Sequence, residues 1–207
     1  MVKKILKENI VYLVLLVVLL LTSICVKTFF YDEILKFDSL ISDFFQLNVV
    51  NNFNTSLMKI ITFFGDGIAF IIIIMCSFIF LKNKSYSFYM MVNLLWTFLI
   101  SVVFKNIIMR ERPMVSLIEK PSDFSFPSGH TMCAVAFYGF ILYLLCKCVK
   151  NYFLKWLIIF AFSMLIIFIG ISRIYLNVHY FTDVVGGALL GLICLFMMIN
   201  IYNKNYN

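Results

Sequence analysis

The sequence predicts an all-α integral membrane protein with six transmembrane helices and both termini in the cytoplasm. Of its 207 residues, 63% are hydrophobic and only 13% are charged, whereas about a quarter of the residues in soluble domains are charged. Long apolar stretches also follow one another along the chain, each close to the roughly 20 residues with which a helix crosses a bilayer core. We expect one domain, residues 1–207, with no repeat and no low-complexity tract.

The apolar stretches contain no Asp, Glu, Lys, Arg or His, with one exception. In order, they are residues 9–26, 60–81, 85–104, 131–146, 156–172 and 184–203. The exception is Asp66 in the second stretch, which lies between two glycines and which we interpret as a turn or a helix cap. Residues 14–21 and 71–74 are apolar on every face, so the alternating pattern of a membrane β-barrel is excluded.

The first stretch has a second interpretation, because lysines followed by an apolar run are also typical of a signal peptide. Cys25 would then suggest a lipoprotein cleavage site. No Ala-x-Ala site follows, however, and Ile24 stands where a lipoprotein signal needs a small residue. We therefore expect an uncleaved first helix.

Positive charge in the short loops sets the orientation of a membrane protein. A cytoplasmic N-terminus collects the following lysines on the inner side, with Glu8 as the only acid: Lys3, Lys4, Lys7, Lys82, Lys84, Lys147, Lys150, Lys155 and Lys204. These lysines are spread singly or in pairs, so no nucleic-acid partner is expected from the net charge of +7. The outer side still holds nearly as many cations: Lys27, Lys36, Lys59, Lys105, Arg110, Arg112, Lys120 and Arg173. That excess requires a separate explanation.

Three further features have structural interpretations. The connection over residues 29–59 mixes charged residues with Phe and Leu, which suits an amphipathic segment on the membrane surface; an ordinary polar loop is the alternative. The cysteines lie in apolar runs without Cys-x-x-Cys spacing and are expected to be packing residues. Gly187 and Gly191 have the spacing of a helix-packing motif.

The outer cations collect at the ends of the predicted helices. Lys105 and Arg112 are seven residues apart, nearly two helical turns, so both are expected on one helix face. Pro113 pushes Arg112 out of helical geometry and ends the helix there. Two cations would point the same way.

A turn precedes the fourth apolar stretch, in the sequence Phe126-Pro127-Ser128-Gly129-His130. Ser128 is a good N-cap, and Gly129 allows a ligand to approach the backbone. The helix that begins here offers unpaired N–H groups and the positive end of its dipole, which together make an anion site.

Ser172-Arg173 precedes the last stretch, followed by His179 and Asp183. If this segment is helical, His179 and Asp183 lie one turn apart. The carboxylate can then accept a hydrogen bond from Nδ1–H, leaving Nε2 as a free nucleophile.

Each feature alone has an ordinary explanation. A single Lys or Arg at a helix end extends its charge to the membrane surface, and a Pro-Ser-Gly turn is a common helix start. Together, however, three cations, two histidines, a helix N-terminus and a carboxylate map to one side of the membrane. Charges at membrane depth are costly and normally functional, so the sequence predicts a site for an anion with several exposed oxygens.

At these residues the sequence resembles the type 2 phosphatidic acid phosphatase superfamily. Its three signature segments are matched in order by Lys105 with Arg112-Pro113, by residues 127–130, and by Ser172-Arg173 with His179 and Asp183. No specified position departs from the pattern. The core motifs span residues 105–183, and the six-helix layout extends the likeness to nearly the whole chain.

The resemblance implies three catalytic residues. His179 would attack phosphorus and form a phosphohistidine, Asp183 would fix its tautomer and stabilise its cation, and His130 would protonate the leaving oxygen. The implied phosphate-binding groups are Lys105, Arg112, Ser128, Gly129 and Arg173. No metal or other cofactor is expected, because Asp183 would be committed to His179 and no set of hard ligands converges.

The resemblance and the outer location imply a lipid phosphate substrate and a multi-pass protein of the cell membrane with an extracytoplasmic site. Residues 122–126 are similar to those of bacterial enzymes acting on undecaprenyl pyrophosphate and phosphatidylglycerophosphate; phosphatidic acid stays open. One alternative is a lipid phosphotransferase with undecaprenyl pyrophosphate as donor. Another is an anion-binding transporter, which would instead place its charges near the bilayer midplane.

Overall fold

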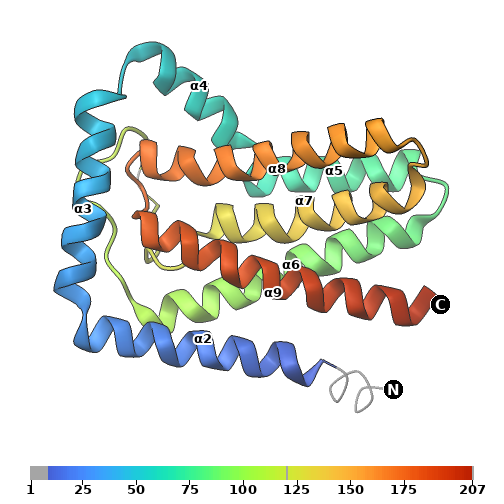
Figure 1. The fold of residues 1–207 in the computed structure, drawn as a ribbon, viewed down its shortest axis with the longest axis horizontal. Coiled ribbons are helices and arrows are strands. Elements are labelled where there is room, and N and C mark those ends of the chain that lie inside the picture. The colour runs from blue at the N-terminus through green and yellow to red at the C-terminus, as the bar shows by residue number, and fades with distance from the viewer. Residues whose placement is uncertain (1–8, 120, 207) are drawn as a thin grey trace.

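The computed structural model describes residues 9–119 and 121–206, and the ordered elements within these ranges are helices. In chain order they are α2 (Ile10–Phe29), α3 (Tyr31–Asn48), α4 (Asn52–Phe63), α5 (Gly67–Phe80), α6 (Lys84–Ile108), α7 (Gly129–Cys148), α8 (Tyr152–Tyr175) and α9 (Phe181–Tyr206). Figure 1 shows α5 to α9 running side by side as a bundle, with α2 along one flank and α3 across one end.

Helix α7 is the centre of the bundle, because it packs against α6, α8 and α9. Two glycines of α9 allow an especially close approach. A Cβ added at Gly187 would lie 2.7 Å from the Ser128 carbonyl oxygen, and one at Gly191 would lie 2.6 Å from that of Met132. The expectation that Gly187 and Gly191 serve helix packing is therefore confirmed. The contact holds the first turn of α7 against the first turns of α9.

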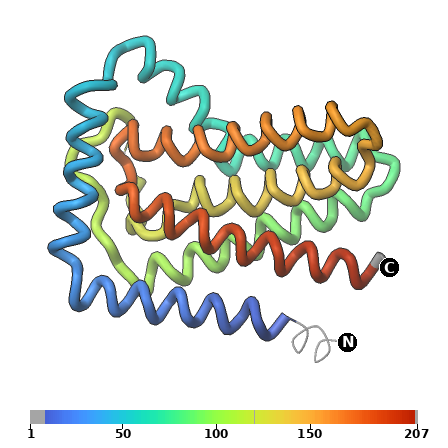
Figure 2. Tube along the Cα trace, viewed as in Figure 1, coloured from blue at the N-terminus to red at the C-terminus, as the bar shows by residue number. Residues whose placement is uncertain are grey.

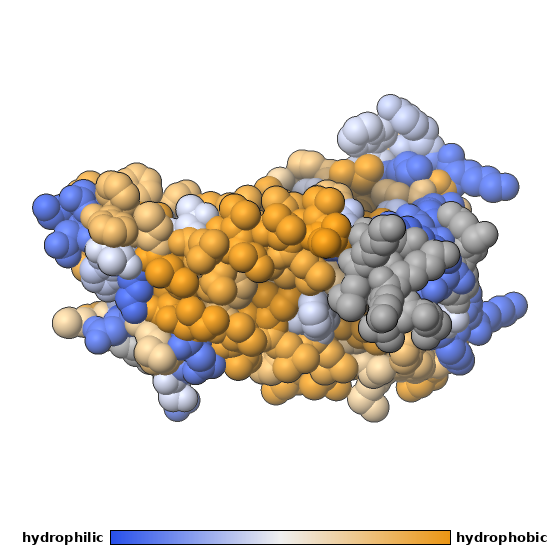
Figure 3. Space-filling model, turned by 90° about the horizontal axis from the view of Figure 1, so that it is seen from below, coloured by the Kyte–Doolittle hydropathy of each residue, from blue (hydrophilic) through white to orange (hydrophobic). Residues whose placement is uncertain are grey.

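The expected fold class is confirmed. Within the described ranges, five helices are long and apolar enough to cross a membrane, and the bent pair α4 and α5 is a sixth candidate span. Figure 3 shows the apolar band that such a protein presents to lipid, with hydrophilic surfaces at its two ends. The chain is a multi-pass membrane protein.

The second span, which includes the apolar stretch over residues 60–81, is not one straight helix. It breaks between α4 and α5 and bends by 48°. Asp66 is the reason, because its side chain accepts a hydrogen bond from the Ile68 backbone N–H at 3.0 Å and caps α5. The interpretation of Asp66 as a cap is confirmed, and the cap restarts the helix in a new direction.

The connection over residues 29–59 is helical rather than an ordinary loop. Helix α3 lies across the end of the bundle (Figure 2). It buries Asp38 and Ser42 while Phe37, Leu40 and Phe44 are exposed. The prediction of an amphipathic segment is confirmed, and the segment is helical. That α3 lies on the membrane surface stays a prediction.

The start of α2, the end of α9 and the α5–α6 and α7–α8 connections share one end of the bundle (Figure 2). Lys82, Lys84, Lys147 and Lys150 lie at this end or in these connections, as the predicted topology requires. Lys3, Lys4 and Lys7 lie outside the described residues. That this end faces the cytoplasm stays a prediction. All six cysteines are free thiols, although only Cys133 and Cys194 are buried in the core.

Candidate active site

The segment between α6 and α7 carries much of the site across the end of the bundle. Helix α6 ends at Ile108, and Met109 follows in the left-handed conformation with φ of 49°. Arg112 therefore lies outside the helix, and the expectation that Lys105 and Arg112 share a helix face is wrong. The two cations still converge, because the chain folds back and the Ser125 backbone N–H donates to the Arg110 carbonyl at 2.7 Å.

A cavity of about 560 Å³ opens at this end of the bundle. Its polar wall contains most of the residues predicted for the site: Lys105, Arg112, Gly129, His130, Arg173 and His179. These residues come from α6, α7, α8 and the loops beside them. Its other wall is apolar and is formed by α5 and α6, where Phe70, Leu94 and Phe98 contribute side chains.

His179 lies in the turn before α9 and is almost fully buried. Arg112 Nη1 lies 3.0 Å from its Nε2. Since a guanidinium can only donate, Nε2 is the acceptor and the ring proton is assigned to Nδ1. Burial, opposed by Asp183 and assisted by Arg112, lowers the pKa of His179 to about 3. The imidazole is therefore neutral near pH 7, with the Nε2 lone pair beside the cations.

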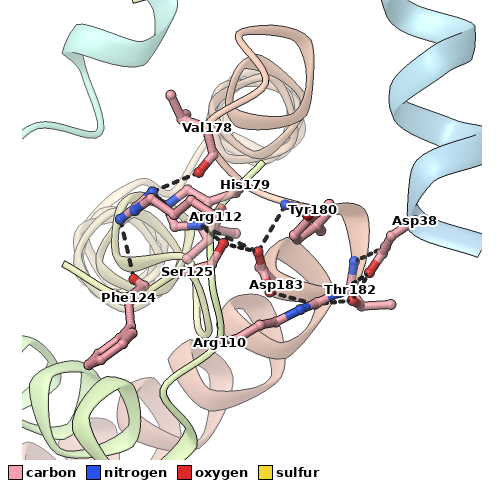
Figure 4. A network of polar contacts seen from close by, with 12 residues as sticks. Asp38, Arg110, Arg112, Phe124, Ser125, Val178, His179, Tyr180, Thr182 and Asp183 are labelled. Carbon is pink, nitrogen blue, oxygen red and sulfur yellow. Dashed lines mark hydrogen bonds and ion pairs between the residues drawn. The ribbon is translucent and has the colours of Figure 1, made fainter. Parts of the chain in front are cut away.

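Asp183 lies behind His179, but its geometry differs from the expected direct hydrogen bond. The distance from His179 Nδ1 to Asp183 Oδ2 is 3.6 Å, which is too long for a hydrogen bond. The Ser125 hydroxyl lies between them: its oxygen is 3.4 Å from His179 Nδ1, and it donates a hydrogen bond to Asp183 Oδ2. The Tyr180 backbone N–H also donates to Oδ2, at 2.9 Å. Figure 4 shows this arrangement.

Asp183 is also not committed to His179 alone. Its Oδ1 lies 2.7 Å from Nη1 of Arg110, whose Nη2 lies 2.6 Å from Asp38 Oδ2 (Figure 4). Asp38 in turn accepts a hydrogen bond from the Thr182 backbone N–H at 3.0 Å. Burial alone would lower the pKa of Arg110, but Asp183 and Asp38 raise it. This buried pairing ties α3 to the start of α9.

Lys105 and Arg112 are joined by a carboxylate that sequence reasoning did not assign to the site. Asp123 places Oδ2 2.8 Å from Lys105 Nζ and Oδ1 2.6 Å from Arg112 Nη2. The Phe124 carbonyl accepts a further hydrogen bond from Lys105 at 2.6 Å. Burial alone would raise the pKa of Asp123, but the two cations lower it. The Asp123 side chain is 52% exposed.

Arg173 differs from the other cations of the cavity. It is 2% exposed and forms no ion pair with any residue that the structure describes. Its Nη1 donates to the Thr62 hydroxyl at 2.6 Å, and its Nε has no hydrogen-bond partner. A buried charge normally requires a counterion, so this guanidinium creates a strong demand for an anion.

The first turn of α7 completes the polar wall. Ser128 is the N-cap residue, as expected, although its hydroxyl lies 3.0 Å from the Thr131 hydroxyl and caps no backbone N–H. Gly129 lines the cavity. The next residue, His130, has Nε2 3.9 Å from Asp66 Oδ2, so the cap of α5 also approaches the predicted general acid.

Sequence reasoning missed Asp38, Arg110, Ser125, Asp123 and, as a site neighbour, Asp66. Signals existed for three of them. Arg110 was one of the outer cations, and Asp123 and Ser125 lie within residues 122–126, the segment that resembles those of bacterial lipid phosphatases. No local pattern marks Asp38, whose partner Arg110 is 72 residues away.

The geometry defines a class: a multi-pass membrane protein with a cavity at one end of its helix bundle that is lined by cations and two histidines. The sequence model of the PAP2 superfamily matches residues 84–207, and the chain belongs to this superfamily. It is 41% identical over 103 residues to phosphatidylglycerophosphatase B of Bacillus subtilis (strain 168), covering 48% of this chain and half of that protein. It is 25% identical over 196 residues to an undecaprenyl-diphosphatase of Sulfolobus acidocaldarius, covering 92% and 90%.

A crystal structure of a transmembrane PAP2-type phosphatidylglycerolphosphate phosphatase from Bacillus subtilis has a similar fold. The TM-score is 0.77 at 28% identity, with 95% of this chain and 96% of that chain covered. The likeness thus extends through the N-terminal helices, beyond the segment that the family model matches. The names of these relatives describe hydrolases of lipid phosphates.

Proposed function

We propose that this protein is a membrane lipid phosphatase that hydrolyses a phosphate or pyrophosphate monoester through a phosphohistidine. The observation that carries the proposal is Arg173, a buried guanidinium without a counterion in the described chain, in a cavity with both histidines. A phosphoryl group supplies the missing negative charge. Three cations and a helix N-terminus can then stabilise the charge of the transferred group.

The apolar wall of the cavity supports a lipid as substrate. It continues from the cations between α5 and α6, where Ile71, Leu95 and Phe98 line the cavity and are also exposed on the lipid-facing surface. A hydrocarbon chain could lie along this wall while its phosphate reaches the polar end. A soluble phosphate ester would gain nothing from such a wall.

The first chemical step uses His179 and His130. The Nε2 lone pair of His179 forms a bond to phosphorus while the bond from phosphorus to the leaving oxygen breaks. His130 donates its proton to that oxygen. Asp183, through Ser125 and at 3.6 Å from Nδ1, stabilises the positive charge that develops on His179.

The second step regenerates the enzyme. Water adds to phosphorus, its proton passes to His130, and the N–P bond breaks with its electron pair returning to Nε2. Inorganic phosphate leaves, and both histidines recover their starting protonation states. An acceptor hydroxyl in place of water would instead give the phosphotransferase reaction.

Phosphate release from purified protein tests the proposal. The panel contains undecaprenyl pyrophosphate, phosphatidylglycerophosphate and phosphatidic acid, and the first two are the expected substrates. Activity should survive EDTA and be blocked by vanadate. Loss of activity in EDTA that Mg²⁺ restores would contradict the metal-free mechanism, phosphate found only on an acceptor would favour the phosphotransferase, and anion transport without phosphate release would favour the transporter.

Two histidine substitutions separate the catalytic roles. His179→Ala should abolish the acid-labile phosphoenzyme formed with a radiolabelled substrate and lower turnover by at least about 10⁴-fold. His130→Ala should slow phosphoenzyme formation most for substrates with poor leaving groups. Wild-type phosphoenzyme levels in His179→Ala would remove the nucleophile assignment.

The outer-face location is tested separately. Right-side-out vesicles from cells that express the protein should hydrolyse an added membrane-impermeant phosphate ester, and inside-out vesicles should not. Hydrolysis only by inside-out vesicles would place the site on the cytoplasmic side.

A further inference from the structure

Asp123 stands at the mouth of the cavity in an unusual position for a carboxylate. Its two oxygens contact Lys105 and Arg112, at 2.8 and 2.6 Å. These are two of the three cations that the proposed function assigns to the phosphoryl oxygens. A carboxylate with one oxygen on each cation occupies the same places as two phosphoryl oxygens. Asp123 and a bound phosphate therefore compete for the same partners.

The exposure of Asp123 makes such an exchange feasible. Its side chain is 52% exposed, whereas those of Lys105 and Arg112 are 8% and 2% exposed. The cations are fixed in the wall of the cavity, but the carboxylate belongs to the loop before α7 and faces water. A partly solvated ion pair is weak enough to open, because water compensates the freed carboxylate.

Asp123 also separates two hollows. On one side is the cavity with both histidines; on the other is an outer hollow of about 450 Å³ lined by residues 110–112, Met114 and residues 121–124. Arg112, Pro121 and Asp123 line both. The outer hollow lies away from the apolar wall between α5 and α6. The Asp123–Arg112 ion pair thus stands between the reacting groups and this second opening.

We propose that Asp123 is a product-release residue. It occupies the phosphoryl-oxygen positions on Lys105 and Arg112 in the free protein, gives way when the substrate phosphate binds, and returns to displace inorganic phosphate toward the outer hollow. The dephosphorylated lipid leaves along the apolar wall. The proposal rests on the proposed function for the identity of the anion, but its central claim concerns competition and can be measured by binding alone.

The substitution Asp123→Asn tests the competition, because it removes the negative charge and nearly keeps the shape. We expect inorganic phosphate and vanadate to inhibit this variant at concentrations about tenfold or more below those for the wild type. A tenfold change corresponds to about 1.4 kcal/mol of binding free energy. Calorimetry with inorganic phosphate should show the same shift. If Asp123 instead serves to position the cations, inhibition and binding weaken, and that result, like an unchanged affinity, overturns the proposal.

Three controls complete the experiment. Asp123→Glu keeps the charge and should keep phosphate inhibition near the wild-type level. Glu111→Gln removes an exposed carboxylate that lines the outer hollow and forms no ion pair with the described part of the chain, and it should leave phosphate affinity unchanged. Asp123→Ser replaces the Asn variant if that protein does not fold, with the same expected direction.

The outcomes also distinguish this proposal from the proposed function. Wild-type protein that releases phosphate from lipids, together with an Asn variant of unchanged phosphate affinity, leaves the phosphatase standing and removes only the role of Asp123. Wild-type protein without phosphatase activity removes the proposed function, while the calorimetric comparison still measures whether Asp123 competes with an anion.

Discussion

The charges on the two sides of His179 are organised in opposite ways. One group, called the inner group here, consists of Arg110, Asp38 and Asp183. Arg110 lies between the two carboxylates, and the three side chains are at most 7% exposed. The other group, called the outer group here, consists of Lys105, Arg112, Arg173 and the half-exposed Asp123, which pairs with Lys105 and Arg112 while Arg173 has no ion pair with any described residue. The inner group thus has two carboxylates and one cation, and the outer group has three cations and one carboxylate.

The difference separates two tasks. The inner group carries excess negative charge, which in the proposed mechanism stabilises a cationic His179 when phosphorus is attached. The outer group carries excess positive charge, which in the same mechanism attracts the phosphoryl group. Buried charges that find partners within the chain serve positioning, whereas those left short of partners serve binding.

The largest effect is expected from Arg110→Met. The substitution leaves Asp38 and Asp183 buried without their cation, so the free energy of unfolding should fall by about 3–5 kcal/mol. Unfolding in detergent, followed by fluorescence, measures it. Arg110→Lys keeps a charge and should lose less; a Met variant as stable as the wild type would mean that the inner group is not a structural unit.

Arg173→Met should lower the phosphatase activity without lowering the stability. Phosphatase activity should fall by about 10²–10³-fold, as on removal of one transition-state contact. The unfolding midpoint should be unchanged or higher, because the substitution removes a buried charge without a counterion. Destabilisation as large as that of Arg110→Met would erase the proposed distinction between the two groups.

Asp38→Asn tests how α3 contributes. The amide oxygen can still accept the hydrogen bond from the Thr182 backbone N–H, but the amide no longer neutralises Arg110, so the free energy of unfolding should fall by about 1–3 kcal/mol. Phosphoenzyme formation should also slow, because the inner group loses its excess negative charge. Asp43→Asn, an exposed carboxylate on the same helix, is the matched control and should resemble the wild type.

The smallest expected effect is on the pH dependence of stability. His179 has a pKa of about 3 in the folded protein and about 6.5 when unfolded, so the unfolded chain binds the additional proton between these values. Stability should therefore fall as the pH drops through this window. His179→Gln should show a shallower decrease in the unfolding midpoint; an identical slope would mean that other groups set the acid sensitivity.

The sequence was sufficient for the helices and for the residues whose signals are local. Uninterrupted apolar stretches predicted the spans, and Lys105, His130, Arg173 and His179 were expected in one site because each lies at a helix end on one side. Most of the features that the sequence did not predict depend on the path of the backbone through loops. The left-handed Met109 takes Arg112 off the helix, and the loop then delivers Asp123 and Ser125.

Long-range pairing was also beyond local patterns. Asp38 is one of several acidic residues in an amphipathic segment, and nothing in the sequence around it indicates a partner 72 residues away. The turn or cap at Asp66 was expected, but the 48° bend of the second span was not, because the apolar composition continues on both sides of the break.

The crosswise placement of α3 has a consequence for modularity. Residues 84–207 carry every signature position of the PAP2 superfamily, and in that sense they look like a minimal catalytic unit. Yet Asp38, Thr62 and Asp66, which contact Arg110, Arg173 and His130, all precede residue 84. The N-terminal third thus contributes to the end of the bundle that holds the cavity and is more than a membrane anchor, so grafting only residues 84–207 onto another scaffold would transplant the proposed reacting groups without these neighbours.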